Sequence, residues 1–170
     1  FLNVVSLVDE PEINFEDKYA VIGDSTGRTK IKYFFTDTDM LIAPDDNMIS
    51  KAMDMSDFEV EFTFDADTIS RVKRAQSALG HQTLSITSGD GSVVLNVTDK
   101  DNPTSNSFAI EVPGKSQSDS FNFLISLSNL RMIQGDYEVG ISKTKMSRFK
   151  HTEQDIIYWI ACEKTSEYGE

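Results

Sequence analysis

The chain has 170 residues, of which 39% are hydrophobic and 26% are charged, and its formal net charge at pH 7 is −12. This length suffices for one medium domain or two small ones, and no apolar run reaches the roughly 18 residues that a membrane-spanning helix needs. A protein with this charge is repelled by nucleic acid as a whole, so DNA binding requires its positive residues to be segregated on one surface. The single cysteine, Cys162, excludes an internal disulfide and a thiolate zinc site, which fits a reducing cytoplasm.

The chain starts at Phe1 without a methionine, and residues 1–8 are largely apolar, so we expect it to begin inside an element of a longer protein. Alternating apolar and polar side chains then predict β-strands at residues 19–22, 30–35, 58–64, 83–87, 92–97, 107–112, 137–142 and 155–162. Gly89-Asp90-Gly91 predicts a hairpin turn between the fourth and fifth of these strands. The last two strands are expected to pair with each other.

Residues 36–57 have the composition of a linker, with Pro44 and several aspartates, and we place a domain boundary near residue 45. The aspartates lack the glycine and the terminal glutamate of a calcium-binding loop, which favours a solvated acidic linker. Three methionines of this segment either have the flexible side chains typical of peptide grooves or tuck onto a neighbouring sheet; these three are Met48, Met53 and Met55. The expected segments are a domain at 1–45, a connector at 46–56 and a domain at 57–170.

Two helices are expected in this strand-rich background. The first runs from about residue 67 to 79, is capped by Asp65 or Asp67 and ends at Gly80. The second is short, about residues 124–132, and is followed by Gly135. The apolar segment at 1–8 and the one at 124–133 are each followed by a turn and a strand pair, which suggests a duplicated architecture. The apolar face of the first helix is formed by Ile69, Val72, Ala75 and Leu79.

Motifs that carry chemistry are missing from the sequence. The two histidines, His81 and His151, have no second histidine or cysteine at ligand spacing, so a zinc site is not expected. His81 follows a helix end, where a charged imidazole interacts favourably with the helix dipole. No nucleophile elbow, phosphate-binding glycine loop or zinc-protease motif occurs. We therefore predict a protein without catalytic activity, cofactor or metal.

Positive charge gathers on the first predicted helix, which carries Arg71, Lys73 and Arg74 away from its apolar face. Between Asp67 and Asp90 the sequence has no acidic residue. The helix face is either an ordinary solvated surface or a surface for phosphates, bound without sequence preference. Arg131 on the second predicted helix would add to the phosphate surface. A further basic group is expected in the turn of the last hairpin, as a solvated turn or a secondary DNA contact: Lys143, Lys145, Arg148 and Lys150.

Several segments resemble the DNA polymerase sliding clamps of T-even-type bacteriophages. Residues 121–125, 129–132 and 135–137 resemble the late helix and strand of these clamps, residues 1–8 resemble the helix that ends the α/β pair of their first domain, and residues 158–163 resemble their final strand. None of these segments is a stringent motif. Their order and spacing fit along essentially the whole chain, and this collinearity carries the resemblance.

The resemblance implies an α+β sliding-clamp fold, with antiparallel sheets outside, few helices lining the inner face and an incomplete first domain. It implies a ring of three identical chains around duplex DNA, bound without sequence preference. The chain would be a processivity factor for a DNA polymerase, placed by a clamp loader in the cytoplasm of an infected bacterium, with no membrane contact. Subunit contacts are expected at residues 29–35 and 106–112. The residues implied to face DNA are Arg71, Lys73, Arg74 and Arg131; those implied to form a partner-peptide pocket beside the connector are Leu41, Ile49, Met53, Met55 and Trp159.

Two departures and two alternatives accompany this prediction. The start of the first clamp domain is missing, and residues 1–8 carry none of the basic residues expected near it, so ring closure is an open question. A non-catalytic phage structural or carbohydrate-binding β-protein is the main alternative. An acidic hydrolase is the other alternative, and it has less support. The location of the four DNA-facing residues discriminates among these, because the clamp mechanism requires them to share one face.

Overall fold

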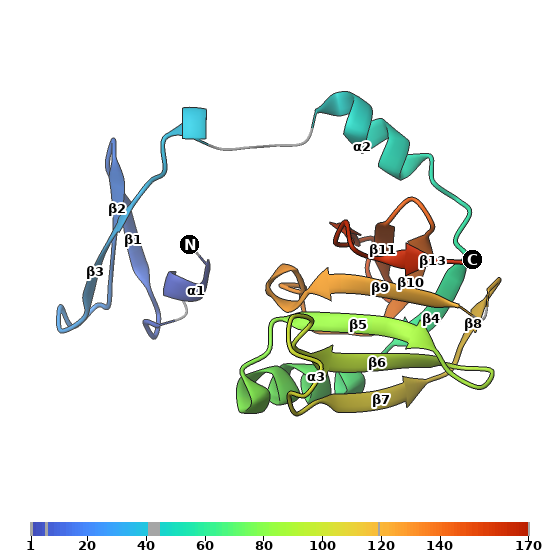
Figure 1. Ribbon diagram of the computed structural model, residues 1–170. Helices are drawn as coiled ribbons and strands as arrows, with labels where there is room; N and C mark the ends of the chain where they lie inside the picture. Colours follow the sequence, from blue (N-terminus) through green and yellow to red (C-terminus); the bar gives the residue numbers. More distant parts are fainter. Residues whose placement is uncertain (1, 6, 41–44, 119, 170) are drawn as a thin grey trace. The chain divides into compact units, whose positions relative to one another are not determined.

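The structure is a computed structural model that describes residues 2–5, 7–40, 45–118 and 120–169. The chain divides into two compact units, Phe1–Ile49 and Ser50–Glu170 (Figure 1). Within the described residues, the first unit contains one three-stranded sheet and the second contains two five-stranded sheets.

The first unit is an antiparallel meander with β2 in the centre. Its elements are α1 (Leu2–Val5), β1 (Glu12–Phe15), β2 (Tyr19–Gly23), β3 (Lys30–Phe34) and the 3-10 helix η1 (Thr38–Met40). Ala20 and Ile22 on β2 are fully buried, whereas Phe34 on β3 is 62% exposed. The strands predicted at 19–22 and 30–35 are confirmed, and β3 is an edge strand of this sheet.

The segment predicted as a linker contains a helix, α2 (Asp46–Met53). Asp45 provides its N-terminal cap, because the carboxylate accepts the N–H of Met48 at 2.7 Å. The expectation of turn-like structure was therefore wrong for residues 46–53. Aspartates favour both turns and helix caps, so composition alone does not separate the two.

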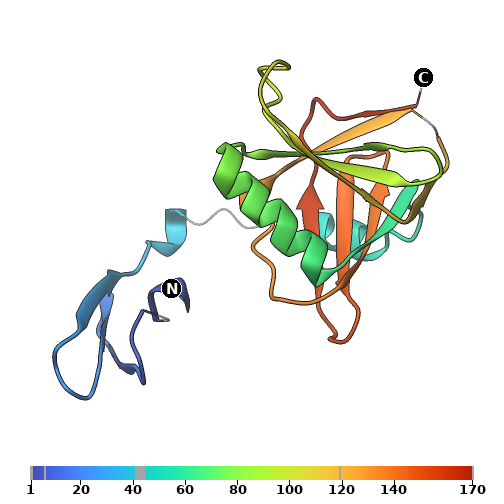
Figure 2. The ribbon, with the colours of Figure 1, turned by 90° about the horizontal axis from the view of Figure 1, so that it is seen from below.

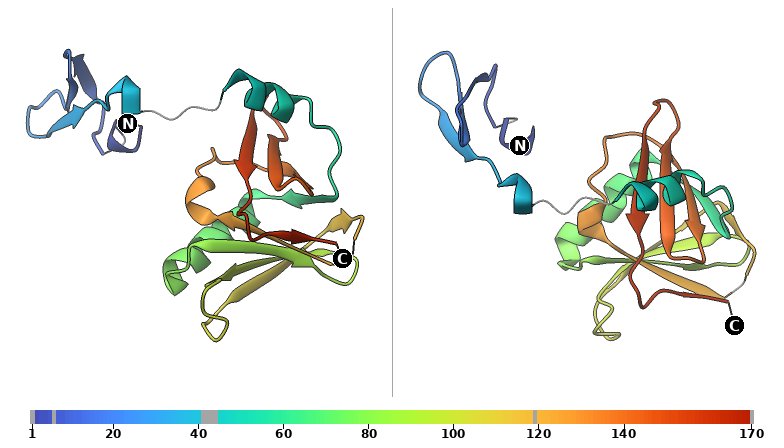
Figure 3. Two further views of the ribbon diagram at one scale, coloured as in Figure 1. Left: turned by 45° about the horizontal axis from the view of Figure 1, so that its top comes forward. Right: turned by 90° about the horizontal axis from the view of Figure 1, so that it is seen from above.

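The second unit contains two antiparallel sheets whose strands cross each other in projection (Figures 2 and 3). The β10 sheet has, in order, β12 (Ile157–Ala161), β11 (Met146–His151), β10 (Tyr137–Ser142), β4 (Val60–Phe64) and β8 (Gly114–Ser116). The β5 sheet has β13 (Glu167–Tyr168), β9 (Phe121–Ser126), β5 (Thr83–Ser88), β6 (Val93–Thr98) and β7 (Phe108–Val112). The strands predicted at 58–64, 83–87, 92–97, 107–112 and 137–142 are confirmed to within two residues at each end.

A single hydrophobic cluster joins the two sheets and the helix α3 (Ala66–Leu79). Phe64 and Phe149 enter it from the β10 sheet, with ring centroids 6.4 Å apart, and Ile86 enters it from the β5 sheet. Val72 and Ala75 are the buried apolar residues that α3 adds. Because side chains alternate across a strand, every second residue of a strand points towards this cluster and the residues between them point to the opposite face of the sheet.

The ends of α3 are those that the sequence predicts. The carboxylate of Asp65 accepts the N–H of Thr68 at 2.7 Å, and this hydrogen bond is the main reason why the pKa of Asp65 lies below its usual value. Gly80 ends the helix in the left-handed conformation, with φ 74°. Figure 2 shows the helix (green) running along one side of the two-sheet unit.

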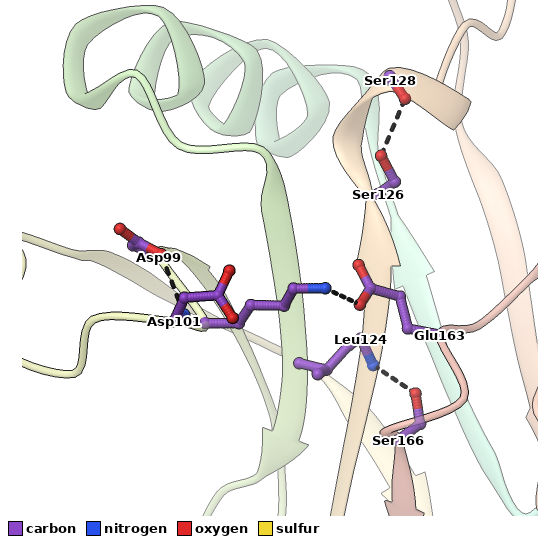
Figure 4. Close-up of polar contacts among 8 residues, drawn as sticks. Asp99, Asp101, Leu124, Ser126, Ser128, Glu163 and Ser166 are labelled. Carbon is purple, nitrogen blue, oxygen red and sulfur yellow. Dashed lines mark hydrogen bonds and ion pairs between the residues drawn. The ribbon is translucent and has the colours of Figure 1, made fainter.

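Residues 124–132, predicted as a second helix, begin instead as the end of β9. β9 pairs with β5 on one side; on the other, the N–H of Leu124 donates to Oγ of Ser166 at 2.9 Å (Figure 4). After β9 the chain forms only the 3-10 turn η2 (Leu127–Asn129). A short apolar run that is buried on both faces has no period that separates helix from strand, which is why the prediction was wrong. The suggested duplication consequently lacks a helix in its second copy.

The last two predicted strands do not pair with each other, because β11 lies between them. β11 was missed because its core-facing residues are Ser147, Phe149 and His151, two of which are polar. The second basic group is therefore not confined to a turn. Its members Arg148 and Lys150 belong to β11.

Candidate nucleic-acid-binding site

The exposed face of α3 carries three of the four residues predicted to face DNA. Arg71, Lys73 and Arg74 are all exposed, while Val72 and Ala75 on the opposite face are buried in the core. The core contacts fix the rotation of the helix about its axis and so determine which side chains reach solvent. The structure therefore brings these three cations together on one helix in a protein of net charge −12.

A groove of about 810 Å³ lies beside this face, between α3 and residues 132–135, and we call it the α3 groove. Lys73 and Arg74 give it positive charge, and Ser70 adds a hydroxyl group that can donate a hydrogen bond. The hydroxyl of Ser77, also in the lining, donates to the carbonyl oxygen of Lys73 at 3.1 Å. Ile69 and Ile133 supply apolar surface. The remaining lining residues are Ala66, Ala78, Met132, Gln134 and Gly135. Cations and hydroxyls along an open groove suit a phosphate backbone.

Arg131, the fourth predicted residue, is exposed and lies between η2 and β10 rather than on a helix. It begins the segment that we call the 131–136 loop, whose residues 132–135 form one wall of the α3 groove. The loop is tied to the helix, because the Asp136 carboxylate accepts the N–H of Ala66, the first residue of α3, at 2.7 Å. Sequence reasoning missed Asp136, which lies 70 residues from the group that it binds.

The second basic group does not form a comparable surface. The amide N–H of Lys143 donates to the Glu59 carboxylate at 2.8 Å, and its ammonium lies 3.5 Å from the same group. The guanidinium carbon of Arg148 lies 4.3 Å from the ring centroid of Phe58. Lys145 donates to the carbonyl oxygen of Lys164 at 2.6 Å. These three cations are engaged within the fold, which favours the structural interpretation for them over a second DNA contact; the fourth, Lys150, is exposed on β11.

The described residues predicted to form a peptide pocket belong to different units. Ile49 belongs to the first unit and is 43% exposed, whereas Met53 lies in the second unit and is 72% exposed. Met55 and Trp159 are half-buried, and the ring of Trp159 lies 6.4 Å from that of Phe58. Leu41, the fifth residue of this prediction, lies outside the described residues. The pocket remains a prediction.

The described residues offer little reactive chemistry. They contain no group of three or more histidine, cysteine, aspartate or glutamate side chains arranged to hold a metal ion. Burial raises the pKa of the Cys162 thiol to about 12, so this thiol stays protonated at neutral pH. His81 bonds through Nε2 to the carbonyl oxygen of Asn106 at 2.6 Å. Over the same residues, no helix has the length and apolar character to cross a membrane.

The sequence comparisons agree on one family. The family described as "gp45 sliding clamp, C terminal" matches residues 61–164. A sliding clamp of Vibrio phage KVP40 is 28% identical over 167 residues, which cover 96% of this chain and 72% of that protein. A sliding clamp of Escherichia phage RB69 is 25% identical over 174 aligned residues, which cover 98% of this chain and 72% of that protein.

Solved structures show the same fold at much lower identity. A DNA polymerase sliding clamp from Caulobacter crescentus has a TM-score of 0.53 and 12% identity, covering 96% of this chain and 43% of the longer protein. The DNA polymerase III β subunit from Borrelia burgdorferi has a TM-score of 0.54 and 14% identity, and the match covers 90% of this chain and 41% of that protein. The chain thus spans about two-fifths of the length of these bacterial proteins, and it has the sliding-clamp fold predicted from its sequence.

Proposed function

Because this chain belongs to the gp45 sliding clamp family, we propose that it acts as a sliding clamp, which encircles duplex DNA and tethers a DNA polymerase to it. The observation that carries the proposal is the exposed basic face of α3 beside the α3 groove. Arg71, Lys73 and Arg74 provide positive charge there, and Arg131 is exposed one residue before Met132, which lines the groove. Contacts of this kind attract phosphates and carry no sequence information.

The charge distribution suits a protein that moves along DNA. A net charge of −12 repels the duplex from most of the surface, so attraction is confined to the basic face. Exposed lysine and arginine side chains hold phosphates through screened and exchangeable contacts, which permits translation along the duplex. The proposal assigns no catalytic step to the chain, because position and charge suffice for the tethering role.

In this proposal residues 1–45 form the C-terminal part of a first clamp domain, residues 46–56 are the connector and residues 57–170 form the second domain. The division into units at Ile49 and Ser50 supports a boundary in this region. β3 and β7 are both edge strands, the position in a sheet at which a strand can pair with another copy of the chain. The two edge strands support self-association into a ring, which is a trimer if it closes. A clamp loader would place this ring on DNA in the cytoplasm of the infected host.

Charge reversal on α3 tests the DNA contact. In the double variant Arg71→Glu/Arg74→Glu, we expect the affinity for duplex DNA at low salt to fall by about tenfold or more. The slope of log K against log salt should become shallower by about 0.9 for each phosphate that the variant no longer neutralises. Fluorescence anisotropy with a labelled duplex over a salt series measures both quantities.

The matched control is Lys150→Glu/Lys164→Glu, which makes the same change in net charge at exposed residues outside α3 and outside the lining of the α3 groove. It should weaken binding only through the general repulsion. Equal reductions of affinity in the two double variants would assign the effect to net charge and contradict a role for α3.

We place the partner site beside the connector and assign to it Met53, which is exposed, and Trp159, which is half-buried. Flexible thioethers and a large aromatic ring are typical of grooves that accept short peptides. We expect Met53→Ala to weaken binding of a fluorescent peptide from the tail of the cognate polymerase by about fivefold. Met48→Ala, a change of the same size on the same helix, is the control. Unchanged affinity in Met53→Ala and Trp159→Ala would move the pocket elsewhere.

A further inference from the structure

The 131–136 loop has no regular structure of its own, yet it forms one wall of the α3 groove. Helical and ladder hydrogen bonds do not hold its backbone, so other contacts with neighbouring elements must hold it. The contacts come from the N-terminus of α3, the strands β10, β11 and β12, and the turn after β11. How they hold the loop decides where Arg131 presents its charge.

The Ile133 peptide is held by two tyrosines. The Tyr137 hydroxyl donates to the Ile133 carbonyl oxygen at 2.7 Å, and the Ile133 N–H donates to the hydroxyl oxygen of Tyr158 at 3.3 Å. Asp136 anchors the far end of the loop, since its carboxylate accepts the N–H of Ala66 and its carbonyl oxygen accepts the N–H of Thr152 at 3.0 Å. These hydrogen bonds hold Ile133 and Asp136 but not the middle of the loop, at Gln134 and Gly135.

His151 fills that position. It ends β11, is 3% exposed, and its ring meets the ring of Tyr137 edge-on with centroids 5.1 Å apart. The backbone of Gly135 lies so close to the ring that a Cβ atom at this position would collide with Nε2. The close approach requires glycine at 135, which also has the positive φ of 154°.

The hydrogen bonds of the ring fix its tautomer. Nδ1 faces the N–H groups of Glu153 and Gln154, both at 3.1 Å. Two converging donors require Nδ1 to be an unprotonated acceptor, which leaves the proton on Nε2, 3.4 Å from the carbonyl oxygen of Gln134. The ring thus organises the β11–β12 turn with one nitrogen and faces the 131–136 loop with the other.

We propose that His151 is a positioning residue for the DNA-facing surface: it holds the 131–136 loop as the wall of the α3 groove and thereby places Arg131. The inference rests on the proposed DNA contact of that surface. It differs from ordinary core packing because it depends on the acceptor nitrogen Nδ1 and not only on the volume of the ring. Nδ1 holds the turn after β11, and the Thr152 N–H of that turn donates to the carbonyl oxygen of Asp136 in the loop. His151 itself does not touch the DNA.

Two substitutions separate acceptor from volume. His151→Phe keeps a ring against Tyr137 and Gly135 but leaves the N–H groups of Glu153 and Gln154 without their acceptor. His151→Asn loses the ring but places Oδ1 close to the position of Nδ1. We expect amide hydrogen exchange of Ile133 to be about tenfold faster in His151→Phe than in the parent, and closer to the parent rate in His151→Asn. A role in packing alone predicts the opposite order.

An NMR spectrum of the His151 ring and a double-mutant cycle between His151 and Arg131 complete the test on the full chain. Long-range ¹H–¹⁵N correlation of the parent should show that Nε2 of His151 carries a proton and that Nδ1 does not. A proton on Nδ1 overturns the proposal. This measurement uses only the parent, so it remains decisive if a variant fails to fold. Arg131→Ala should weaken duplex binding in the parent and have a smaller effect in His151→Phe, and additive effects would contradict the coupling. If the parent shows no contact between duplex and α3, the proposed function fails, while the tautomer and exchange results still decide whether His151 holds the loop.

Discussion

Replacing Tyr137 with alanine is expected to lower the free energy of unfolding by about 3–5 kcal/mol, as for other large aromatic side chains in a core. Tyr137 is fully buried on β10, and its ring contacts those of His151 and Tyr158, with centroids 5.1 Å and 6.1 Å away. Its hydroxyl also holds the carbonyl oxygen of Ile133. The variant therefore removes core volume and a tie to the 131–136 loop together. Urea unfolding followed by circular dichroism measures the change.

Tyr137→Phe is the control, because it removes the hydroxyl and keeps the ring. It should cost about 0.5–1.5 kcal/mol, the range for one hydrogen bond, and leave the core intact. The expected order of stability is parent, phenylalanine variant, alanine variant. Equal destabilisation in the two variants would mean that the ring contributes little and would contradict the assignment of Tyr137 to the core.

Replacing Gly140 with alanine is expected to cost about 1–3 kcal/mol, although the residue lies in the middle of a strand. A Cβ atom at Gly140 would lie 2.5 Å from the nearest ring carbon of Phe58, which is only 6% exposed. The rings of Phe58 and Trp159 and the guanidinium of Arg148 pack together at this site. The added methyl group must therefore displace Phe58, the side chain next to the connector.

The only tryptophan, Trp159, reports this displacement, so its fluorescence should change in Gly140→Ala. The double variant Phe58→Ala/Gly140→Ala removes the collision, and its destabilisation should be clearly smaller than the sum of the two single effects. Additive effects, with unchanged fluorescence in Gly140→Ala, would show that Phe58 does not occupy this position.

The sequence is informative where one side of an element is apolar and the other polar. β4 and β6 alternate cleanly, and α3 has a capping aspartate, a helical apolar stripe and a terminal glycine, so these elements were predicted closely. β9 and β11 deviate from the pattern for opposite reasons. β9 buries apolar side chains on both faces, with Leu124 on one and Phe123 and Ile125 on the other, whereas β11 buries Ser147 and His151. Local pattern does not report what a neighbouring strand buries, and that is where the predictions failed.

The candidate site divides in the same way. The three cations of α3 were found from charge and helical spacing alone, since both are local properties. The α3 groove was not, because its second wall is an irregular loop whose path depends on Asp136, His151 and Tyr158. Each of these three side chains contacts a group far away in sequence, and no sequence motif indicates such a contact. Arg131 was found for its charge but assigned to the wrong kind of element.

The central claim is that duplex DNA contacts the α3 face and no other face of the second unit. Amide chemical-shift mapping of the ¹⁵N-labelled chain with a short duplex at low salt tests it directly, because it locates even weak contacts. We predict shifts that saturate together at Ser70, Lys73, Arg74 and Arg131 and that disappear as salt is raised. Shifts centred on β11 around Lys150, or no shifts on α3 at any salt concentration, would contradict the claim.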